Sequence, residues 1–153
     1  MRSIAAIALP ILLPLWAGVV IGVSLIAAPI KFQAPSLTLR TGAEIGLYTF
    51  HFLVTFEFCL LSVGIIAAAM AQARRFTAIT LVILTAILFL QRFWLLPVLD
   101  VHVAELLAGN VTRSSAHHTV YAIMEVAKVG LLIAAATVES RSSRLTPRVL
   151  TPQ

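Results

Sequence analysis

The sequence predicts an all-α membrane protein built as a bundle of four transmembrane helices. Two observations support this: hydrophobic residues make up 60% of the 153-residue chain and charged residues only 11%, and four long apolar runs divide it. An ordinary soluble domain has roughly 45–50% apolar and about 25% charged residues. So few charges cannot cover a water-facing surface without leaving large apolar patches. The composition therefore excludes a soluble enzyme, a zinc-finger domain and a disordered tail.

Each apolar run is long enough to cross a bilayer. Residues 4–30 contain no charge, and the run between Glu44 and Arg74 holds 29 residues. Residues 76–99 and 116–138 form the other two runs. A helix needs about 20 residues to span the hydrocarbon core, and lipid offers no partners to unpaired backbone groups. We predict helices at 4–30, 45–73, 76–108 and 115–138 in one domain over 1–138, followed by a mobile basic tail at 139–153.

The first helix is predicted to be retained rather than cleaved as a signal peptide. Its apolar run is longer than the usual signal core of about 7–15 residues, and Pro29 would follow the cleavage site directly. Gly18 and Gly22 are four residues apart, a spacing that lets another helix approach closely. We therefore predict helix packing at these two glycines.

Local signals mark the ends of the other helices. Thr41-Gly-Ala-Glu44 fits a capping box that would begin the second helix. Gly109-Asn110 is the first stop signal of the third helix, which we expect to kink at Pro97, tilt or protrude. Ser114 or Ser115 is predicted to cap the fourth helix.

The basic residues predict the orientation. One side of the predicted topology carries six arginines, and the other carries three basic residues: Arg2, Arg74, Arg75, Arg141, Arg144 and Arg148 against Lys31, Arg40 and Arg113. The positive-inside rule then places both termini in the cytoplasm. The net charge of +5 is explained by topology and lipid headgroups, so we expect no nucleic-acid partner. The expected location is a bacterial inner membrane.

Ionisable residues inside the spans are few, and each is costly in a bilayer. Glu57, Arg92, Glu125 and Lys128 all lie roughly 12–20 Å from the outer ends of their helices at 1.5 Å per residue. Two acids and two bases at similar depth would form a neutral, paired cluster. This cluster has two interpretations: a structural ion-pair network, or the base of a ligand pocket.

The fourth helix carries the sharpest pattern. Ser114, His117, Tyr121, Glu125 and Lys128 are spaced 3, 4, 4 and 3 residues apart, which places them on one stripe of a helix. A polar stripe on an apolar helix is expected to face the bundle interior or a water-filled cavity. The stripe predicts that Tyr121, Glu125 and Lys128 belong to the same pocket as Glu57 and Arg92.

All four histidines fall on the predicted outer side. These are His51, His102, His117 and His118, and His102 and Glu105 have the i, i+3 spacing found in helical metal sites. With carboxylates they would suit a divalent metal ion, and two histidines could ligate haem. The other interpretation is that they hydrogen-bond to headgroups, water and loop backbone. The single cysteine excludes an internal disulfide and a cysteine-rich metal cluster.

The order of several short motifs resembles a known group of proteins. The motifs are Pro29-x-x-Phe32-x-x-Pro35, Glu57, Leu96-Pro97-x-x-Asp100 and Ser115-x-x-His118-x-x-Tyr121-x-x-x-Glu125-x-x-Lys128. Their order resembles that of small four-helix bacterial membrane proteins of unknown function, distantly related to the cisplatin-resistance-associated transmembrane protein. The resemblance implies the four-helix fold and adds modest weight to a metal. Such proteins are expected to have an Asn shortly before the second-helix Glu, where this chain has Val54.

The leading functional hypothesis is a non-enzymatic membrane protein that binds or passes a small cation, either a metal ion or a proton, in an outward-facing pocket. The histidines would form its entrance, and Glu57 and Glu125 would be the deeper ligands. Two alternatives remain: an assembly subunit of a larger membrane complex, and a haem- or metal-dependent redox protein. Besides the lipid bilayer, a second copy of the chain is an expected partner, because four helices barely enclose a pocket.

Overall fold

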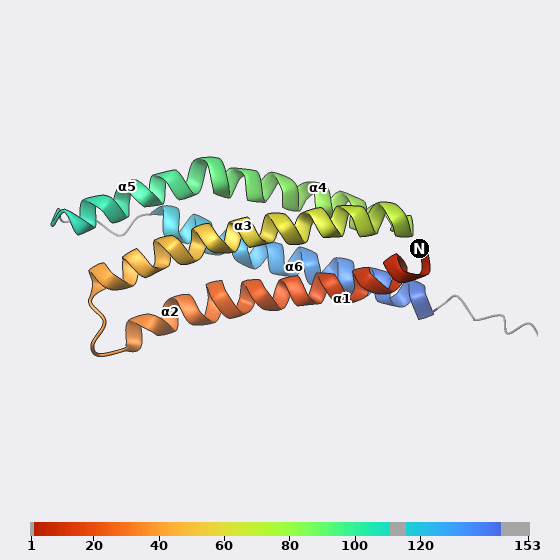
Figure 1. Cartoon of the computed structure of the whole chain (residues 1–153), viewed down its shortest axis with the longest axis horizontal. Helices are drawn as coiled ribbons and strands as arrows, with labels where there is room; N and C mark the ends of the chain where they lie inside the picture. The colour runs from red at the N-terminus through yellow and green to blue at the C-terminus, as the bar shows by residue number, and fades with distance from the viewer. Residues whose placement is uncertain (1, 111–115, 145–153) are drawn as a thin grey trace, which may run out of the picture.

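The structure, a computed structural model, describes residues 2–110 and 116–144, with side chains described over 7–110 and 116–141. The chain forms four long helical rods that lie side by side (Figure 1). The first rod joins α1 (Arg2–Val20), the π-helical η1 (Ile21–Ala27), α2 (Ala28–Ile30) and the 3₁₀ turn η2 (Lys31–Gln33). The second rod is α3 (Leu39–Ala71) and the fourth is α6 (Ala116–Arg144). The third joins α4 (Arg75–Leu90), the π-helical η3 (Gln91–Leu95) and α5 (Leu96–Leu107).

Each rod is long and apolar enough to cross a membrane. Within the described residues the candidate spans are Ile7–Gln33, Leu39–Ala71, Arg75–Leu107 and Ala116–Arg141. The predicted fold class, an all-α four-helix bundle of a polytopic membrane protein, is therefore confirmed. We call the end where α1 begins and α6 ends the terminal end, and the opposite end, which holds residues 34–38, the loop end (Figure 1).

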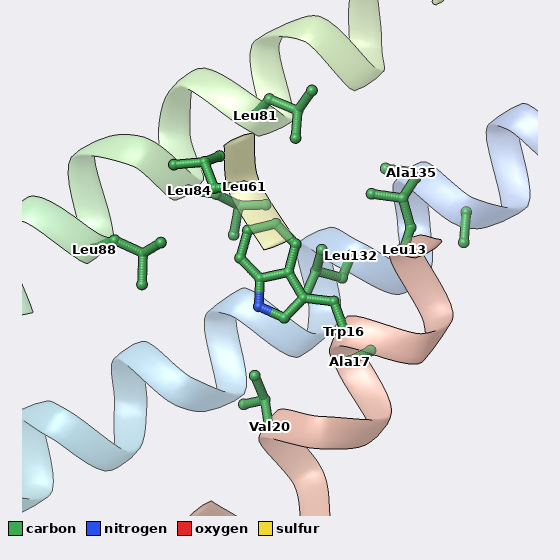
Figure 2. Close-up of a cluster of buried hydrophobic side chains, with 11 residues drawn as sticks. Leu13, Trp16, Ala17, Val20, Leu61, Leu81, Leu84, Leu88, Leu132 and Ala135 are labelled. Carbon is green, nitrogen blue, oxygen red and sulfur yellow. The ribbon is translucent and has the colours of Figure 1, made fainter. Parts of the chain in front are cut away.

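An apolar core fills the terminal half of the bundle. Trp16 is fully buried at its centre, surrounded by side chains from all four rods (Figure 2). Its neighbours are Leu13, Ala17, Val20, Leu61, Leu81, Leu84, Leu88, Leu132, Ala135 and Ala136. Large apolar side chains also point outward, including Phe52 and Val82, which are 73% and 70% exposed. Such an outward apolar face suits contact with lipid.

Both π-helical segments precede a proline. η1 ends two residues before Pro29, and η3 ends two residues before Pro97. A proline has no N–H to donate, and its ring clashes with the carbonyl four residues earlier. A widened turn accommodates that clash without breaking the helix. The third helix was expected to kink at Pro97, tilt or protrude. The structure has instead a π-helical segment just before this proline, and Gln91 lies within that segment.

The ends of several helices differ from the prediction. α3 begins at Leu39, six residues earlier than predicted, because the Thr38 hydroxyl accepts a hydrogen bond from the backbone N–H of Thr41 at 3.2 Å. The Thr41–Glu44 capping box is therefore wrong. The predicted stop at Gly109 is confirmed, since Gly109 has a φ of 93° and the next backbone N–H bonds to Glu105.

The fourth helix is longer than predicted. α6 continues through Arg144, so residues 139–144 are helical and do not belong to a mobile tail. Glu139 helps to hold this last turn, because its carboxylate accepts hydrogen bonds from the Arg74 backbone N–H and the Thr77 hydroxyl. Residues 145–153 and the predicted caps Ser114 and Ser115 lie outside the described residues.

The predicted packing at Gly18 and Gly22 is wrong within this chain. A side chain added at either glycine would have open space around it. The buried face of α1 carries Trp16 and Ala17, and consecutive helical residues point about 100° apart, so Gly18 faces outward. The close approach occurs instead on α3, where a Cβ at Gly42 would lie 2.3 Å from the Phe32 ring.

Candidate functional site

Five polar side chains meet in the interior of the bundle, and every membrane span contributes to them. We call Trp16 of α1, Glu57 of α3, Gln91 of η3, and Glu125 and Lys128 of α6 the polar cluster. All five side chains are fully buried. The cluster lies next to the apolar core, because its Trp16 is also the central residue of that core (Figure 2).

Lys128 is the centre of the polar cluster. Its ammonium donates to Glu57 Oε2 at 2.6 Å and to the Gln91 Oε1 at 3.0 Å, and it lies 2.8 Å from Glu125 Oε1. Lys128 thus makes two hydrogen bonds, to Glu57 and Gln91, and an ion pair with Glu125. Lys128 thereby ties α6 to both α3 and η3.

Both oxygens of Glu57 are also used. The Trp16 indole N–H donates to Oε1 at 2.8 Å, while Oε2 accepts from Lys128. Both oxygens of Glu57 therefore have a hydrogen-bond donor. Glu57 is also absent from the residues that line the pocket described below. Its environment fits a structural carboxylate that is fixed in one orientation.

Glu125 differs from Glu57 in having one oxygen to spare. Oε1 accepts from the Gln91 side-chain amide at 2.8 Å and lies beside Lys128. The hydrogen bond from Gln91 and the ion pair with Lys128 together restrict the orientation of the carboxylate. Within the described part of the chain, Oε2 is buried and has no hydrogen-bond partner.

The formal charges of the polar cluster do not cancel. Glu57 and Glu125 together carry two negative charges when ionised, and Lys128 supplies one positive charge. A buried charge without compensation is expensive, and more so in a membrane interior. A proton or another cation at the cluster would neutralise it, and Glu125 Oε2 is the atom with acceptor capacity left.

A pocket opens beside Glu125 in the loop half of the bundle. Its volume is about 650 Å³, and it is lined by residues of η1, α2, η2, α3, α5 and α6. The walls are mainly apolar and include Phe32, Leu47, Phe50, Leu96, Leu99 and Val103. None of the residues of the apolar core lines it. The described residues therefore form a pocket that reaches Glu125 from one half of the bundle.

Three residues that line this pocket each have a buried oxygen with unused hydrogen-bonding capacity. Among the described residues, Ser24 Oγ, Tyr121 Oη and Glu125 Oε2 are the buried side-chain oxygen or nitrogen atoms without a hydrogen-bond partner. Buried polar atoms are nearly always paired, because an unpaired one costs about 1–3 kcal/mol. Three such atoms lining one pocket indicate a place for a polar ligand.

Charged and polar side chains lie closer to the loop end of the pocket. Lys31, Asp100, His102 and His118 line it there. The Lys31 ammonium lies 5.1 Å from the centroid of the Phe32 ring, and it is accommodated by Gly46, where a Cβ would lie 2.8 Å from Nζ. Glycine at this position therefore lets Lys31 pack directly against α3.

Three of the four histidines make pairwise contacts in the described residues. His51 Nε2 lies 2.9 Å from Asp100, which joins α3 to α5. The His102 and His117 rings are 5.5 Å apart, and His102 Nδ1 is hydrogen-bonded to the Val98 carbonyl. Glu105 is exposed. No group of three His, Cys, Asp or Glu in the described residues is placed to hold a metal ion.

The predicted pocket residues divide into two groups. The stripe on α6 is buried as predicted at Tyr121, Glu125 and Lys128, and Glu57 joins it. Arg92 is the exception: it is half-buried and, among the described residues, forms no ion pair with either glutamate. Gln91, the preceding residue, points into the bundle in its place.

Three residues of the site were missed from sequence. Gln91 and Trp16 belong to the polar cluster, and Ser24 lines the pocket. A signal existed for Gln91, because it lies beside Arg92 at the depth of Glu125. Trp16 and Ser24 carried no such signal, since both residue types are common in apolar helices.

The chain was compared with known proteins at three levels. No family model, no curated protein and no solved structure matches it. The resemblance to the small four-helix bacterial membrane proteins therefore stays a prediction.

Proposed function

We propose that the protein binds a small monovalent cation, a proton or an ammonium-type ion, in the pocket beside Glu125. The observation that carries the proposal is Oε2 of this carboxylate, which is buried and has no hydrogen-bond partner. Glu125 lines the pocket and also belongs to the polar cluster, whose ionised side chains carry one excess negative charge. A single bound positive charge would neutralise the cluster. Its site would be open to exchange through the pocket.

The surroundings of Glu125 support a monovalent cation over a divalent metal. Among the described residues that line the pocket, Glu125 Oε2 is the buried carboxylate oxygen without a hydrogen-bond partner, and the other unpaired oxygens are the hydroxyls of Ser24 and Tyr121. Divalent first-row metals favour several imidazole, thiolate or carboxylate ligands together. The described histidines and carboxylates do not provide such a group.

The proposal also includes an orientation. Arg74, Arg75 and Arg141 lie at the terminal end of the bundle, where Arg2 and Arg144 also fall. The positive-inside rule favours this end as the cytoplasmic one. The pocket would then open toward the outer side of a bacterial inner membrane, and its cation would come from that side.

Infrared difference spectroscopy on the purified protein in lipid tests proton binding at Glu125. We expect a carbonyl band of a protonated carboxylic acid that disappears as the pH is raised. The band should be absent from Glu125→Gln and present in Glu105→Gln, which removes an exposed carboxylate of α5. A band that is unchanged in Glu125→Gln would contradict the proposal.

A further inference from the structure

The geometry points to a ligand class: we infer that the pocket binds a primary organic ammonium ion with an apolar body. The inference rests on the proposed function, because it uses the same Glu125 carboxylate, and it adds the chemistry of the molecule that fills the rest of the pocket. Three observations support it: three unpaired oxygens, one excess negative charge in the polar cluster, and the largely apolar walls of the pocket.

The polar part of the pocket matches a primary ammonium group. Such a group has three N–H donors, and the described pocket offers three buried oxygens without partners, on Ser24, Tyr121 and Glu125. The bond to Glu125 Oε2 would be charge-assisted and the strongest of the three. The bound positive charge would bring the cluster of Glu57, Glu125 and Lys128 to neutrality.

A proton transfer from Glu125 to the amine nitrogen would conserve both atoms and charge. An amine that enters the pocket as its neutral base has a free nitrogen lone pair. If Glu125 is protonated before binding, the proton moves from its Oε2 to that nitrogen, which leaves a carboxylate and an ammonium ion. No other reactant is needed, and the total charge of the pocket does not change in this step.

The apolar part of the pocket matches a hydrocarbon or aromatic body. Its volume of about 650 Å³ lies within the range of ligand pockets, roughly 300–1,000 Å³. Phe50 and Tyr121 stand with ring centroids 4.6 Å apart along the wall, and Leu96 and Leu99 lie beside them. An inorganic ion would leave these walls without contacts, whereas an alkyl or aryl group would cover them.

The loop end of the pocket disfavours a second positive charge. The Lys31 ammonium lines it there, and the nearby carboxylate of Asp100 is already hydrogen-bonded to His51. A diamine would place its second ammonium near Lys31, where like charges repel. The expected ligand therefore carries one positive charge, at the end that reaches Glu125.

Isothermal titration of the full chain in detergent tests the inference with phenethylammonium as the probe. Two matched probes accompany it: neutral phenethyl alcohol, and the trimethyl derivative, which keeps the charge but has no N–H. We expect phenethylammonium to bind at least ~10-fold more tightly than either. Glu125→Gln should weaken it by ~10- to 100-fold, and Tyr121→Phe or Ser24→Ala by ~2- to 10-fold. Glu105→Gln serves as the control and should bind like the wild type.

Each other outcome overturns the inference. Equal binding of the alcohol would show that the positive charge does not contribute to binding. Equal binding of the trimethyl derivative would show that the N–H donors do not contribute to it. Equal binding to Glu125→Gln would assign the heat to partition into micelles. If phenethylammonium does not bind while the infrared band of Glu125 still titrates, the ligand class is wrong and the proposed function stands. If the band is also unaffected by Glu125→Gln, both fail.

Discussion

Replacing Lys128 by Met tests whether the buried ion pairs hold the bundle together. The substitution keeps an unbranched side chain but removes the ammonium that contacts Glu57, Glu125 and Gln91. All three contacts involve the charged ammonium. Their separate values come to roughly 4.5–9 kcal/mol.

The net loss is expected to lie at or below the lower end of that range. Met gains some apolar contact, and the two carboxylates can each take up a proton instead of remaining charged. Removing one partner of a buried pair typically costs about 3–5 kcal/mol. We therefore expect Lys128→Met to lower the free energy of unfolding by about 3–5 kcal/mol, more than a hundredfold in the equilibrium constant.

Reversible unfolding in mixed detergent micelles, followed by circular dichroism, measures this loss. Leu132→Met is a matched control, because it places Met at a fully buried α6 position and should cost less than about 1.5 kcal/mol. Glu57→Gln combined with Lys128→Met should be more stable than the sum of the two single losses predicts. If Lys128→Met lies within about 1 kcal/mol of the wild type, the ion pairs do not hold the bundle.

Three further substitutions test the local structure. Trp16→Phe removes the indole N–H that is donated to Glu57, and it should lower the free energy of unfolding by about 1.5–3 kcal/mol. A loss no larger than that caused by Trp94→Phe, at an exposed position, would argue against this bond. Thr38→Ala removes the cap of α3 and should cost about 0.5–2 kcal/mol, with faster hydrogen exchange confined to the first turn; unchanged exchange there would contradict the cap. Pro97→Ala restores a backbone N–H donor six residues after Gln91 and should slow hydrogen exchange across η3, whereas unchanged exchange there would show that the π-helical segment has another cause.

The sequence was sufficient to predict the fold because its signals are local. Runs of apolar residues gave the four spans, and the spacing of Tyr121, Glu125 and Lys128 predicted the buried stripe of α6. Helix ends were less predictable, because Thr38 and Thr41 are both good caps and only the chain path decides between them.

The composition of the site depended on contacts that spacing does not encode. A helical pattern cannot distinguish Gln91 from Arg92 as the inward residue, because the register changes at η3. The pocket required Ser24 of η1 to line the same space as Glu125 of α6, just over a hundred residues later in the chain. The histidines illustrate the same limit, since His51 pairs with Asp100 rather than with another histidine.

The central claim is that Glu125, and not Glu57, is the carboxylate that exchanges a cation with the pocket. Carbon-13 NMR of the side-chain carboxyls in the lipid-embedded protein, assigned with Glu125→Gln and Glu57→Gln, tests it most directly. We predict that the Glu125 resonance moves when ammonium ion is added at constant pH, while that of Glu57, whose oxygens are bonded to Trp16 and Lys128, stays in place. A Glu125 resonance that stays constant, or a Glu57 resonance that moves in its place, would contradict the account.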